Sequence, residues 1–511
     1  MKKSVLLFTL VLPATVMAQT AHDGAEKHPN VVFIMVDDFG WMDVSYNGSS
    51  FYETPNIDRI AAQGMQFTDG YASASISSPT RVSFMTGKYP ARNGITDWIP
   101  GYQYGRTREQ LSHYKMLAPD MPLNMPLEEV TIAEALKENG YTTFHVGKWH
   151  CAEEEGYYPQ DQGFDVNVGG WLKGSPNGVA RANGGNGAYN TPYCNPYLED
   201  GPEGEFLTDR LGDSGVELIR TRDKDKPFFL YLSFYAVHTP IDPKPEVVEY
   251  FQQKAQKMGV ADADPFSEDF EWMRQVDYKA WHWKERTIQN DPEYAALIYT
   301  MDQNVGRILD VLAEEGIDEN TIVCLMGDNG GLSTAEGSPT TNAPLRAGKG
   351  WLYEGGIRVP FLIKYPQVVE AGSVCHTPVV AVDFYPTLLE LSGLETKPEQ
   401  HVDGVSLCPL LEGKMNFNRG PLFFHYPHYG GKGDTPASAI REGDWKLMEF
   451  FEDQHIELYN LKEDLSETRD LSAQESARAR RLLKKLRNWR KDCDAKLPVA
   501  NAAYAVPEHR K

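Results

Sequence analysis

The stretch "VVFIMVDDFG", residues 31–40, is a run of six apolar residues that ends in Asp37 and Asp38. Its length and its β-branched and aromatic residues are typical of a buried strand. Three further apolar runs of this kind end in polar groups, namely "TTFHVGKWH" (142–150) in Lys148 and His150, "FFLYLSFYAVH" (228–238) in His238, and "TIVCLM" (321–326) in Asp328 and Asn329. Four strands are therefore expected to carry reactive polar groups at their ends.

Helical patterns alternate with these runs, as in "NIDRIAAQGMQF" (56–67), "TIAEALKENG" (131–140) and "EYAALIYTMDQNVGRILDVLAEEG" (293–316). This alternation predicts an α/β fold with a mostly parallel sheet and helices on both faces. Because ligands of open α/β sheets bind at the carboxyl ends of the strands, we expect the four polar ends to converge on one crevice.

The carboxylates and the amide of this set suit a metal ion. Asp37, Asp38, Asp328 and Asn329 offer oxygen atoms and no thiolate, which favours a hard cation such as Ca²⁺. Taken singly, each pair is an ordinary turn or cap sequence. Lys148 and His150 are two residues apart, so they share a face if the strand continues to its end.

The stretch "SASISSPTRVSFMTGKYP", residues 73–90, predicts a short helix that starts at Pro79 and ends at Gly87. Ser77 would lie at the helix entrance, where unpaired N–H groups and the nearby Arg81 stabilise an anion. The alternative is a plain serine cap with a surface arginine. Ser73, Ser75 and Ser78 are interpreted as turn and cap residues.

Composition limits the function classes. The 511 residues carry a net charge of −22, which argues against a nucleic-acid partner. The opening "MKKSVLLFTLVLPATVMAQT" is typical of a cleaved signal peptide, residues 1–18, and no cysteine follows it to carry a lipid anchor. No later apolar run reaches the roughly 18 residues of a membrane span. We therefore expect a periplasmic or secreted protein. Six scattered cysteines form no zinc or redox motif.

The pattern changes after residue 412 to short strands and a basic helix, "RARRLLKKLRNWRK" (478–491), with an apolar face. The segment "HYPHYG" (425–430) places His425 and His428 among tyrosines, and such side chains make good sugar contacts. The same segment is also typical of a turn. Asp97 and Trp98 have the same two interpretations, substrate contact or ordinary structure.

Several segments of the chain resemble a known protein family. "SSPTR" followed by "VSFMTGKYP" is similar to the signature of formylglycine-dependent sulfatases, in which a Cys or Ser before x-Pro-x-Arg is oxidised to an aldehyde. Matching segments run in order over most of residues 30–470, among them "GYTTFHVGKWH", "GDNGG", "LRAGKGWLYEGGIRVPFLIKYP" and "VDFYPTLLELSG". The likeness is greatest to serine-type carbohydrate sulfatases of gut Bacteroides. Two departures are Thr80, where Ser or Ala is usual, and Ser77 in place of Cys, which requires a serine-type sulfatase-maturing enzyme before export.

The resemblance implies an alkaline-phosphatase-like fold with a catalytic domain at 30–412 and a smaller α+β subdomain at 413–511, made of an antiparallel sheet and a helix. It implies that Ser77 becomes formylglycine (3-oxoalanine) and that one Ca²⁺ is held by Asp37, Asp38, Ser77, Asp328 and Asn329. Arg81, Lys148 and Lys349 would hold the sulfate oxygens. His238 would protonate the leaving sugar oxygen, and His150 would take the proton that expels sulfate.

The expected substrate is a sulfated carbohydrate of a host glycan, such as a glycosaminoglycan or mucin, with galactose or N-acetylgalactosamine preferred, attacked at a chain end. Two alternatives stay open. One is a phosphomonoester or phosphodiester hydrolase of the same superfamily that uses Ser77 unmodified. The other is a non-catalytic protein that binds sulfated glycans through the same pocket.

Overall fold

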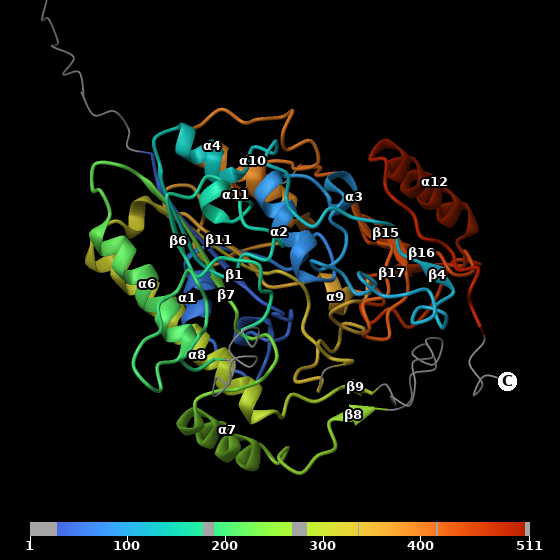
Figure 1. The fold of residues 1–511 in the computed structure, drawn as a ribbon, viewed down its shortest axis with the longest axis horizontal. Helices are drawn as coiled ribbons and strands as arrows, with labels where there is room; N and C mark the ends of the chain where they lie inside the picture. Colours follow the sequence, from blue (N-terminus) through green and yellow to red (C-terminus); the bar gives the residue numbers. More distant parts are fainter. Residues whose placement is uncertain (1–27, 177–188, 268–283, 336, 415–416, 506–511) are drawn as a thin grey trace, which may run out of the picture.

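A mixed eight-stranded sheet forms the centre of the molecule (Figure 1). The computed structural model describes residues 28–176, 189–267, 284–335, 337–414 and 417–505, so the expected signal segment, residues 1–18, lies outside the described residues. The strands lie in the order β12 (Ser373–Cys375), β2 (Met65–Phe67), β11 (Phe361–Lys364), β10 (Thr321–Gly327), β1 (Asn30–Val36), β7 (Phe228–Phe234), β5 (Thr142–Gly147) and β6 (Val166–Val168). Within this sheet, only β11 pairs antiparallel with its neighbours.

Helices cover both faces of this sheet (Figure 1). Alternate residues of β1 show why: Phe33 and Met35 pack in one apolar cluster, and Ile34 and Val36 in another. The first cluster takes in residues of α2 (Ser77–Thr86), α4 (Ile132–Glu138), α10 (Phe384–Leu391) and α11 (Cys408–Leu411). The second takes in residues of α1 (Pro55–Gln63), α6 (Leu207–Thr221), α7 (Pro245–Met258) and α8 (Pro292–Glu314).

A second, antiparallel sheet lies toward the C-terminus and is covered by a helix (Figure 1). Its strands are β14 (Leu422–Tyr426), β15 (Ala437–Glu442), β16 (Trp445–Phe450) and β17 (Ile456–Asn460), and the helix is α12 (Ser476–Asp492). The apolar face expected for the basic helix is present, because Leu482, Leu486 and Trp489 are buried. The predicted α/β class with a smaller C-terminal sheet and helix is therefore confirmed.

Short elements complete the fold. They are the helices α3 (Pro90–Asn93) and α9 (Glu354–Ile357), and the strand pairs β3 (Gly70–Tyr71) with β13 (Val379–Val380), β4 (Met116–Leu117) with β18 (Val499–Ala500), and β8 (Phe266–Ser267) with β9 (Glu285–Arg286). Among the helices that the structure describes, none combines the length and apolar character of a membrane span.

One local prediction was wrong, and the condition attached to another is not met. The helix that carries the serine cluster begins at Ser77, so Pro79 is its third residue and not its first, while Gly87 ends it in the expected left-handed conformation. The strand of Lys148 stops at Gly147, where φ is +102° and a Cβ would lie 1.9 Å from the Ser233 carbonyl oxygen. Lys148 and His150 therefore reach the site from a loop.

Candidate active site

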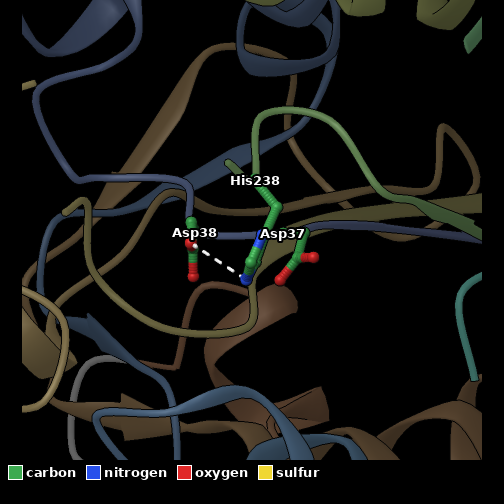
Figure 2. Close-up of side chains that lie close together, drawn as sticks. All are labelled: Asp37, Asp38 and His238. Carbon is green, nitrogen blue, oxygen red and sulfur yellow. Dashed lines mark ion pairs between the residues drawn. The ribbon is translucent and has the colours of Figure 1, made fainter. Parts of the chain in front are cut away.

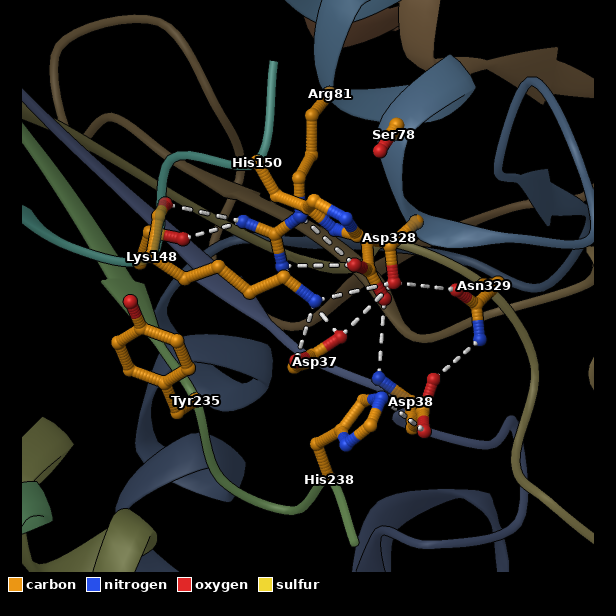
Figure 3. A network of polar contacts seen from close by, with 12 residues as sticks. Asp37, Asp38, Ser78, Arg81, Lys148, His150, Tyr235, His238, Asp328 and Asn329 are labelled. Atoms are coloured by element: carbon orange, nitrogen blue, oxygen red, sulfur yellow. Dashed lines mark hydrogen bonds and ion pairs between the residues drawn. The ribbon is translucent and has the colours of Figure 1, made fainter. Parts of the chain in front are cut away.

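The polar residues that follow four adjacent strands meet at one edge of the central sheet (Figure 3). Strands β10, β1, β7 and β5 are neighbours in the sheet and are mutually parallel. Their carboxyl ends therefore open on the same side. The convergence predicted from the sequence is present, and it includes Asp37, Asp38, Lys148, His150, His238, Asp328 and Asn329.

Three buried carboxylates form the floor of the site. Asp37 and Asp328 have no exposed surface, and Asp38 is 2% exposed. Burial raises the pKa of Asp37 to about 8, against the opposing effect of Lys148. Burial also acts on Asp38, but Lys349 and His238 outweigh it and hold its pKa below the ordinary value. Burial thus disfavours the charged form of Asp37, whereas the neighbouring cations stabilise the charged form of Asp38.

Ser77 stands at the first position of α2, above these carboxylates. Its Oγ lies 3.1 Å from Asp37 Oδ1, 3.2 Å from Asn329 Oδ1 and 3.3 Å from Lys148 Nζ. The helix N-terminus and the ammonium of Lys148 both favour negative charge at this atom.

Arg81 lies one turn further along α2 and is completely buried. Its Nε and Nη2 donate to Asp328 Oδ2 at 2.9 and 2.7 Å, and its Nη1 donates to Ser233 Oγ at 2.5 Å. These bonds fix the guanidinium beneath the helix entrance. A fork of donors held in this way cannot be reproduced by lysine.

Two lysines and two histidines complete the site. Lys148 Nζ donates to Asp37 Oδ2 at 2.7 Å, and Lys349 Nζ donates to Asp38 Oδ2 at 2.8 Å. His238 Nε2 lies 3.1 Å from Lys349 Nζ, and its Nδ1 lies 2.6 Å from the Thr239 carbonyl oxygen. His150 Nε2 lies 3.0 Å from the Ile99 carbonyl oxygen. Burial and the nearby Lys148 hold the pKa of His150 well below its ordinary value.

The donor set fits a hard divalent cation. Asp37, Asp38, Asp328 and Asn329 bring only oxygen atoms, and the three carboxylates are balanced by Arg81, Lys148 and Lys349. A divalent ion would make this group positive overall, which suits an anionic ester. A nitrogen donor is also close, because Asp37, Asp38 and His238 offer ligand atoms within 4.8 Å of one another (Figure 2). The residues therefore fit a metal, with His238 at its edge.

A pocket of about 630 Å³ opens above Ser77. Ser77, His150, His238 and Lys349 all line it. The remaining wall comes from Ile76, from the loop that contains Trp98 and Arg106, from Glu153 and residues 172–175, and from residues 430–432. The pocket is thus closed jointly by the central sheet's loops and by the loop between β14 and β15.

The candidate substrate residues have mixed outcomes. Trp98 lines the pocket as expected. His425 does not: it is 1% exposed, and its ring bonds to Ser438 Oγ at 2.7 Å and to the Lys496 carbonyl oxygen at 2.8 Å. His428 is 3% exposed, with its Nε2 2.7 Å from Thr96 Oγ1. Neither histidine is among the described residues of the pocket wall. Their positions therefore do not support the interpretation as sugar contacts.

Asp97 is a support for the pocket wall. Its side chain is buried, accepts the backbone N–H groups of Trp98 and Tyr102 at 2.9 and 3.0 Å, and lies 3.2 Å from the Tyr426 hydroxyl. It therefore shapes the loop that carries Trp98. Burial raises the pKa of Asp97 to about 6.

Several wall residues gave no signal in the sequence. They are Tyr102, Arg106, Glu153, Leu172, Lys173 and Lys432. Arg106 stands in a polar loop and Lys432 in a glycine-rich turn, so both resemble ordinary surface positions until the loops are placed. Ser233, which holds Arg81, was also missed, although it stands in the β7 run as a single polar residue among apolar ones.

Comparison with known proteins agrees with this geometry. The Sulfatase family profile matches residues 29–394, and the profile for the C-terminal part of N-sulphoglucosamine sulphohydrolase matches residues 347–492. A sulfatase of Formosa agariphila is 34% identical to this chain, over 95% of this chain and 93% of its own length. The N-acetylgalactosamine-6-sulfatase of Mus musculus is 29% identical, over 83% of this chain and 72% of its own.

The N-acetylglucosamine-6-O-sulfatase of Bacteroides thetaiotaomicron is 26% identical, over 91% of this chain and 87% of its own. The solved structure of Ps i-CgsB in complex with k-i-k-neocarrahexaose superimposes with a TM-score of 0.70 at 27% identity, covering 95% of this chain and 96% of that one.

Proposed function

The chain belongs to the sulfatase family, whose profile matches residues 29–394, and we propose that it hydrolyses the O-sulfate ester of a carbohydrate with residue 77 as nucleophile. The observation that carries the proposal is the position of Ser77. Its Oγ lies within 3.3 Å of a carboxylate, an amide oxygen and an ammonium, at a helix entrance that opens into the pocket.

The proposed nucleophile is formylglycine made from Ser77. Hydrated, such an aldehyde supplies a hydroxyl that attacks sulfur and a second hydroxyl whose deprotonation expels the sulfate, which a plain serine cannot do. Lys148 and Lys349 are proposed to pair with the sulfate oxygens, since the Lys148 ammonium lies 3.3 Å from Ser77 Oγ and Lys349 lines the pocket. The resemblance implied that Arg81 also holds a sulfate oxygen, but its guanidinium is fully buried and donates to Asp328 and Ser233. Arg81 is therefore proposed to fix the helix entrance and Asp328 instead.

The two histidines are proposed to move protons at opposite ends of the reaction. His238 lines the pocket beside Lys349, and its Nδ1 is held by the Thr239 carbonyl, so its Nε2 is the atom that faces the leaving oxygen. His150 lines the pocket and its Nε2 is held by the Ile99 carbonyl, so its Nδ1 is proposed to accept the proton that expels sulfate.

A calcium ion is proposed at Asp37, Asp38, Asp328, Asn329 and residue 77. A bound divalent ion would stabilise the charge that develops on the transferred group. Chelation followed by return of one metal at a time tests this assignment. We expect calcium to restore sulfate release and to raise the melting temperature. If only zinc does so, and His238 is required for zinc retention, the phosphohydrolase alternative gains and the calcium site is wrong.

For the sugar, we propose galactose or N-acetylgalactosamine at an exposed chain end of a host glycan. One aligned relative is named for an N-acetylgalactosamine sulfate and another for an N-acetylglucosamine sulfate. The names of the relatives therefore support both sugars. We further propose export to the periplasm or beyond after residue 18, a maturing enzyme that acts on Ser77 before export, and a subdomain boundary at residue 412.

The decisive experiment is intact mass together with sulfate release. We expect protein matured with a serine-type enzyme to weigh two hydrogens less at Ser77 and to release sulfate from a panel of sulfated monosaccharides. The Ser77→Ala variant should fold, because Ser77 is the first residue of α2 and not its capping residue, and it should release no sulfate. Sulfate release by Ser77→Ala would exclude the proposed nucleophile. Binding of sulfated sugars without turnover by the matured protein would favour the glycan-binding alternative.

A further inference from the structure

The backbone turn that follows β7 carries His238 and is fastened to Asp37 on one side. The Asp37 N–H donates to the Ala236 carbonyl at 3.1 Å, and the Val237 N–H donates to the Asp37 carbonyl at 2.9 Å. The turn is closed by the His238 N–H, which donates to the Tyr235 carbonyl at 2.9 Å. One side of the turn is therefore fixed by the residue that follows β1.

Tyr189 holds the other side of this turn. It has no exposed surface, and its hydroxyl lies 3.0 Å from the Tyr235 carbonyl oxygen and 2.8 Å from the His238 carbonyl oxygen. A phenol has one proton to donate, and two acceptors at these distances can share it. Burial raises the pKa of Tyr189 well above its ordinary value, and Asp37 and Asp38 act in the same direction, so the hydroxyl stays a donor. One hydroxyl thus contacts both ends of the turn.

The start of α6 fixes Tyr189 in turn. The Tyr189 ring stacks on Phe206, with the ring centroids 5.6 Å apart and an interplanar angle of 21°. Leu207, the first residue of α6, donates its N–H to the Tyr189 carbonyl at 2.7 Å. The next residue, Asn190, donates from Nδ2 to Asp242 Oδ2 at 3.2 Å, further along the loop that follows the turn. Tyr189 is therefore a firm connection between α6 and this loop.

The position of the His238 ring depends on the backbone of this turn. Its Nδ1 lies 2.6 Å from the carbonyl oxygen of Thr239, the next residue along the chain. Its Nε2 lies 3.1 Å from Lys349 Nζ and 3.7 Å from Asp38 Oδ2 (Figure 3). Because the ring is tied to the adjacent backbone, a shift of the turn moves Nε2 with it. A general acid works only within hydrogen-bond distance of the oxygen that it protonates.

We propose that Tyr189 is a positioning residue for proton transfer by His238, because its hydroxyl holds the turn that aims Nε2 at the leaving sugar oxygen. This inference rests on the proposed function, which assigns the acid role to His238. In that step a bond forms between sulfur and the oxygen of residue 77, the bond from sulfur to the sugar oxygen breaks, and the proton of Nε2 passes to the sugar oxygen. Tyr189 is not among the described residues of the pocket wall, so it acts through the turn and not on the substrate.

The dependence of the rate on the leaving group tests the proposal, with Tyr189→Phe as the variant that removes only the hydroxyl. Matured protein is assayed on the panel of sulfated monosaccharides, whose sugar alcohols need a proton to leave, and on 4-nitrophenyl sulfate, whose nitrophenolate does not. We expect kcat to fall about tenfold or more for the sugar sulfate but less than about threefold for the aryl sulfate. His238→Ala should show the same selectivity with a larger loss on the sugar, about 100-fold or more.

Tyr385→Phe is the matched control. Tyr385 also has no exposed surface, and its hydroxyl donates to the Val130 carbonyl at 2.8 Å, away from the described pocket wall. Both variants lose one buried hydrogen-bond donor, so both should lower the melting temperature by a similar amount, but Tyr385→Phe should change neither rate. The double variant of Tyr189→Phe and His238→Ala should turn over the sugar sulfate within about twofold of His238→Ala alone, because the two residues act on one step.

The proposal is overturned if Tyr189→Phe leaves the sugar rate unchanged, slows sugar and aryl sulfates by the same factor, or lowers the sugar rate equally with and without His238. If the wild type does not accept the aryl sulfate, the double variant decides. If Tyr189→Phe does not fold, Phe206→Leu decides, because it removes the ring on which Tyr189 stacks and should give the same selective loss. Failure of the proposed function would look different: His238→Ala itself would slow both esters equally, or matured wild type would release no sulfate from any sugar, and the positioning role would fall with it.

Discussion

At the scale of single residues, Arg81 is the side chain whose geometry the site depends on most. Three of its nitrogens donate, two to Asp328 and one to Ser233, and none of its surface is exposed. We expect Arg81→Lys to lower kcat/KM for a sulfated sugar by about 100-fold, because an ammonium cannot replace the fork. Breaking this buried pair should also lower the free energy of unfolding by about 3 kcal/mol, measured in urea.

Arg92 provides the matched control for this prediction. Its Nε and Nη2 donate to the two carboxylate oxygens of Asp403, each at 2.9 Å, but the side chain is 31% exposed and does not line the pocket. Arg92→Lys should cost about 1 kcal/mol or less and leave kcat/KM unchanged. If Arg81→Lys keeps kcat/KM within threefold of the wild type, the guanidinium group of Arg81 is not required for activity.

Some site residues could be predicted from the sequence and others could not. Asp37, Lys148 and Asp328 could be predicted because each follows an apolar run, and in an α/β sheet the end of such a run is where ligands bind. His425 was misjudged because alternation along β14 does not reveal which face is buried, and this ring turns inward to Ser438. Arg106 was missed because it stands in a polar loop that no local sequence pattern places beside the pocket.

At the scale of elements, the end of β5 decides where Lys148 points. Gly147 has φ of +102°, and a Cβ there would overlap the Ser233 carbonyl of the neighbouring β7. Gly147→Ala should therefore cost about 3 kcal/mol or more of unfolding free energy and should lower sulfate release, since it must shift Lys148. The sequence predicts the strand but not its last residue, because a glycine within a strand can mark a bulge, a bend or a close backbone contact as well as the strand end.

Gly140, just before the same strand, is the matched control, because it has a positive φ like Gly147 but no neighbouring atom that a Cβ would meet. Its φ is +86°, and a Cβ there would meet nothing within 4 Å. Gly140→Ala should cost only about 1 to 2 kcal/mol, from the left-handed conformation alone, and should leave sulfate release as it is. Equal unfolding free energies for the two variants would mean that the contact with β7 is not what holds the end of β5.

At the scale of the whole molecule, a buried ionic cluster joins the C-terminal sheet to the segment that carries Lys349. Lys446 on β16 lies 3.0 Å from Glu354 Oε1, at the start of α9, and 2.8 Å from Glu467 Oε1. All three side chains are fully buried. Tyr71 adds a bond from β3, at 2.6 Å to Glu354 Oε2. Lys446 thus pairs with both carboxylates, and Arg358 Nη1 lies 3.4 Å from Glu354 Oε2. The separate strands and helices do not predict this junction.

The cluster makes the stability of the junction depend on pH. Burial raises the pKa of Glu467 to about 7, with the neighbouring Glu354 acting in the same direction and Lys446 opposing both. A carboxyl whose pKa is higher in the folded than in the unfolded state binds an extra proton when folded, so its contribution is full below about pH 4.5 and is lost as pH rises through about 7. Glu467→Gln, which mimics the protonated form, should therefore become more stable relative to wild type by roughly 1 to 3 kcal/mol between pH 5 and pH 8.

Urea unfolding of both proteins at several pH values measures that difference. Glu463→Gln, an exposed carboxyl in the same loop, is the control and should differ from wild type by an amount that does not change with pH. A loss of stability of Glu467→Gln relative to wild type as pH rises would contradict the prediction. The junction would then favour the ionised carboxylate of Glu467, and Lys446 would hold both glutamates charged at neutral pH.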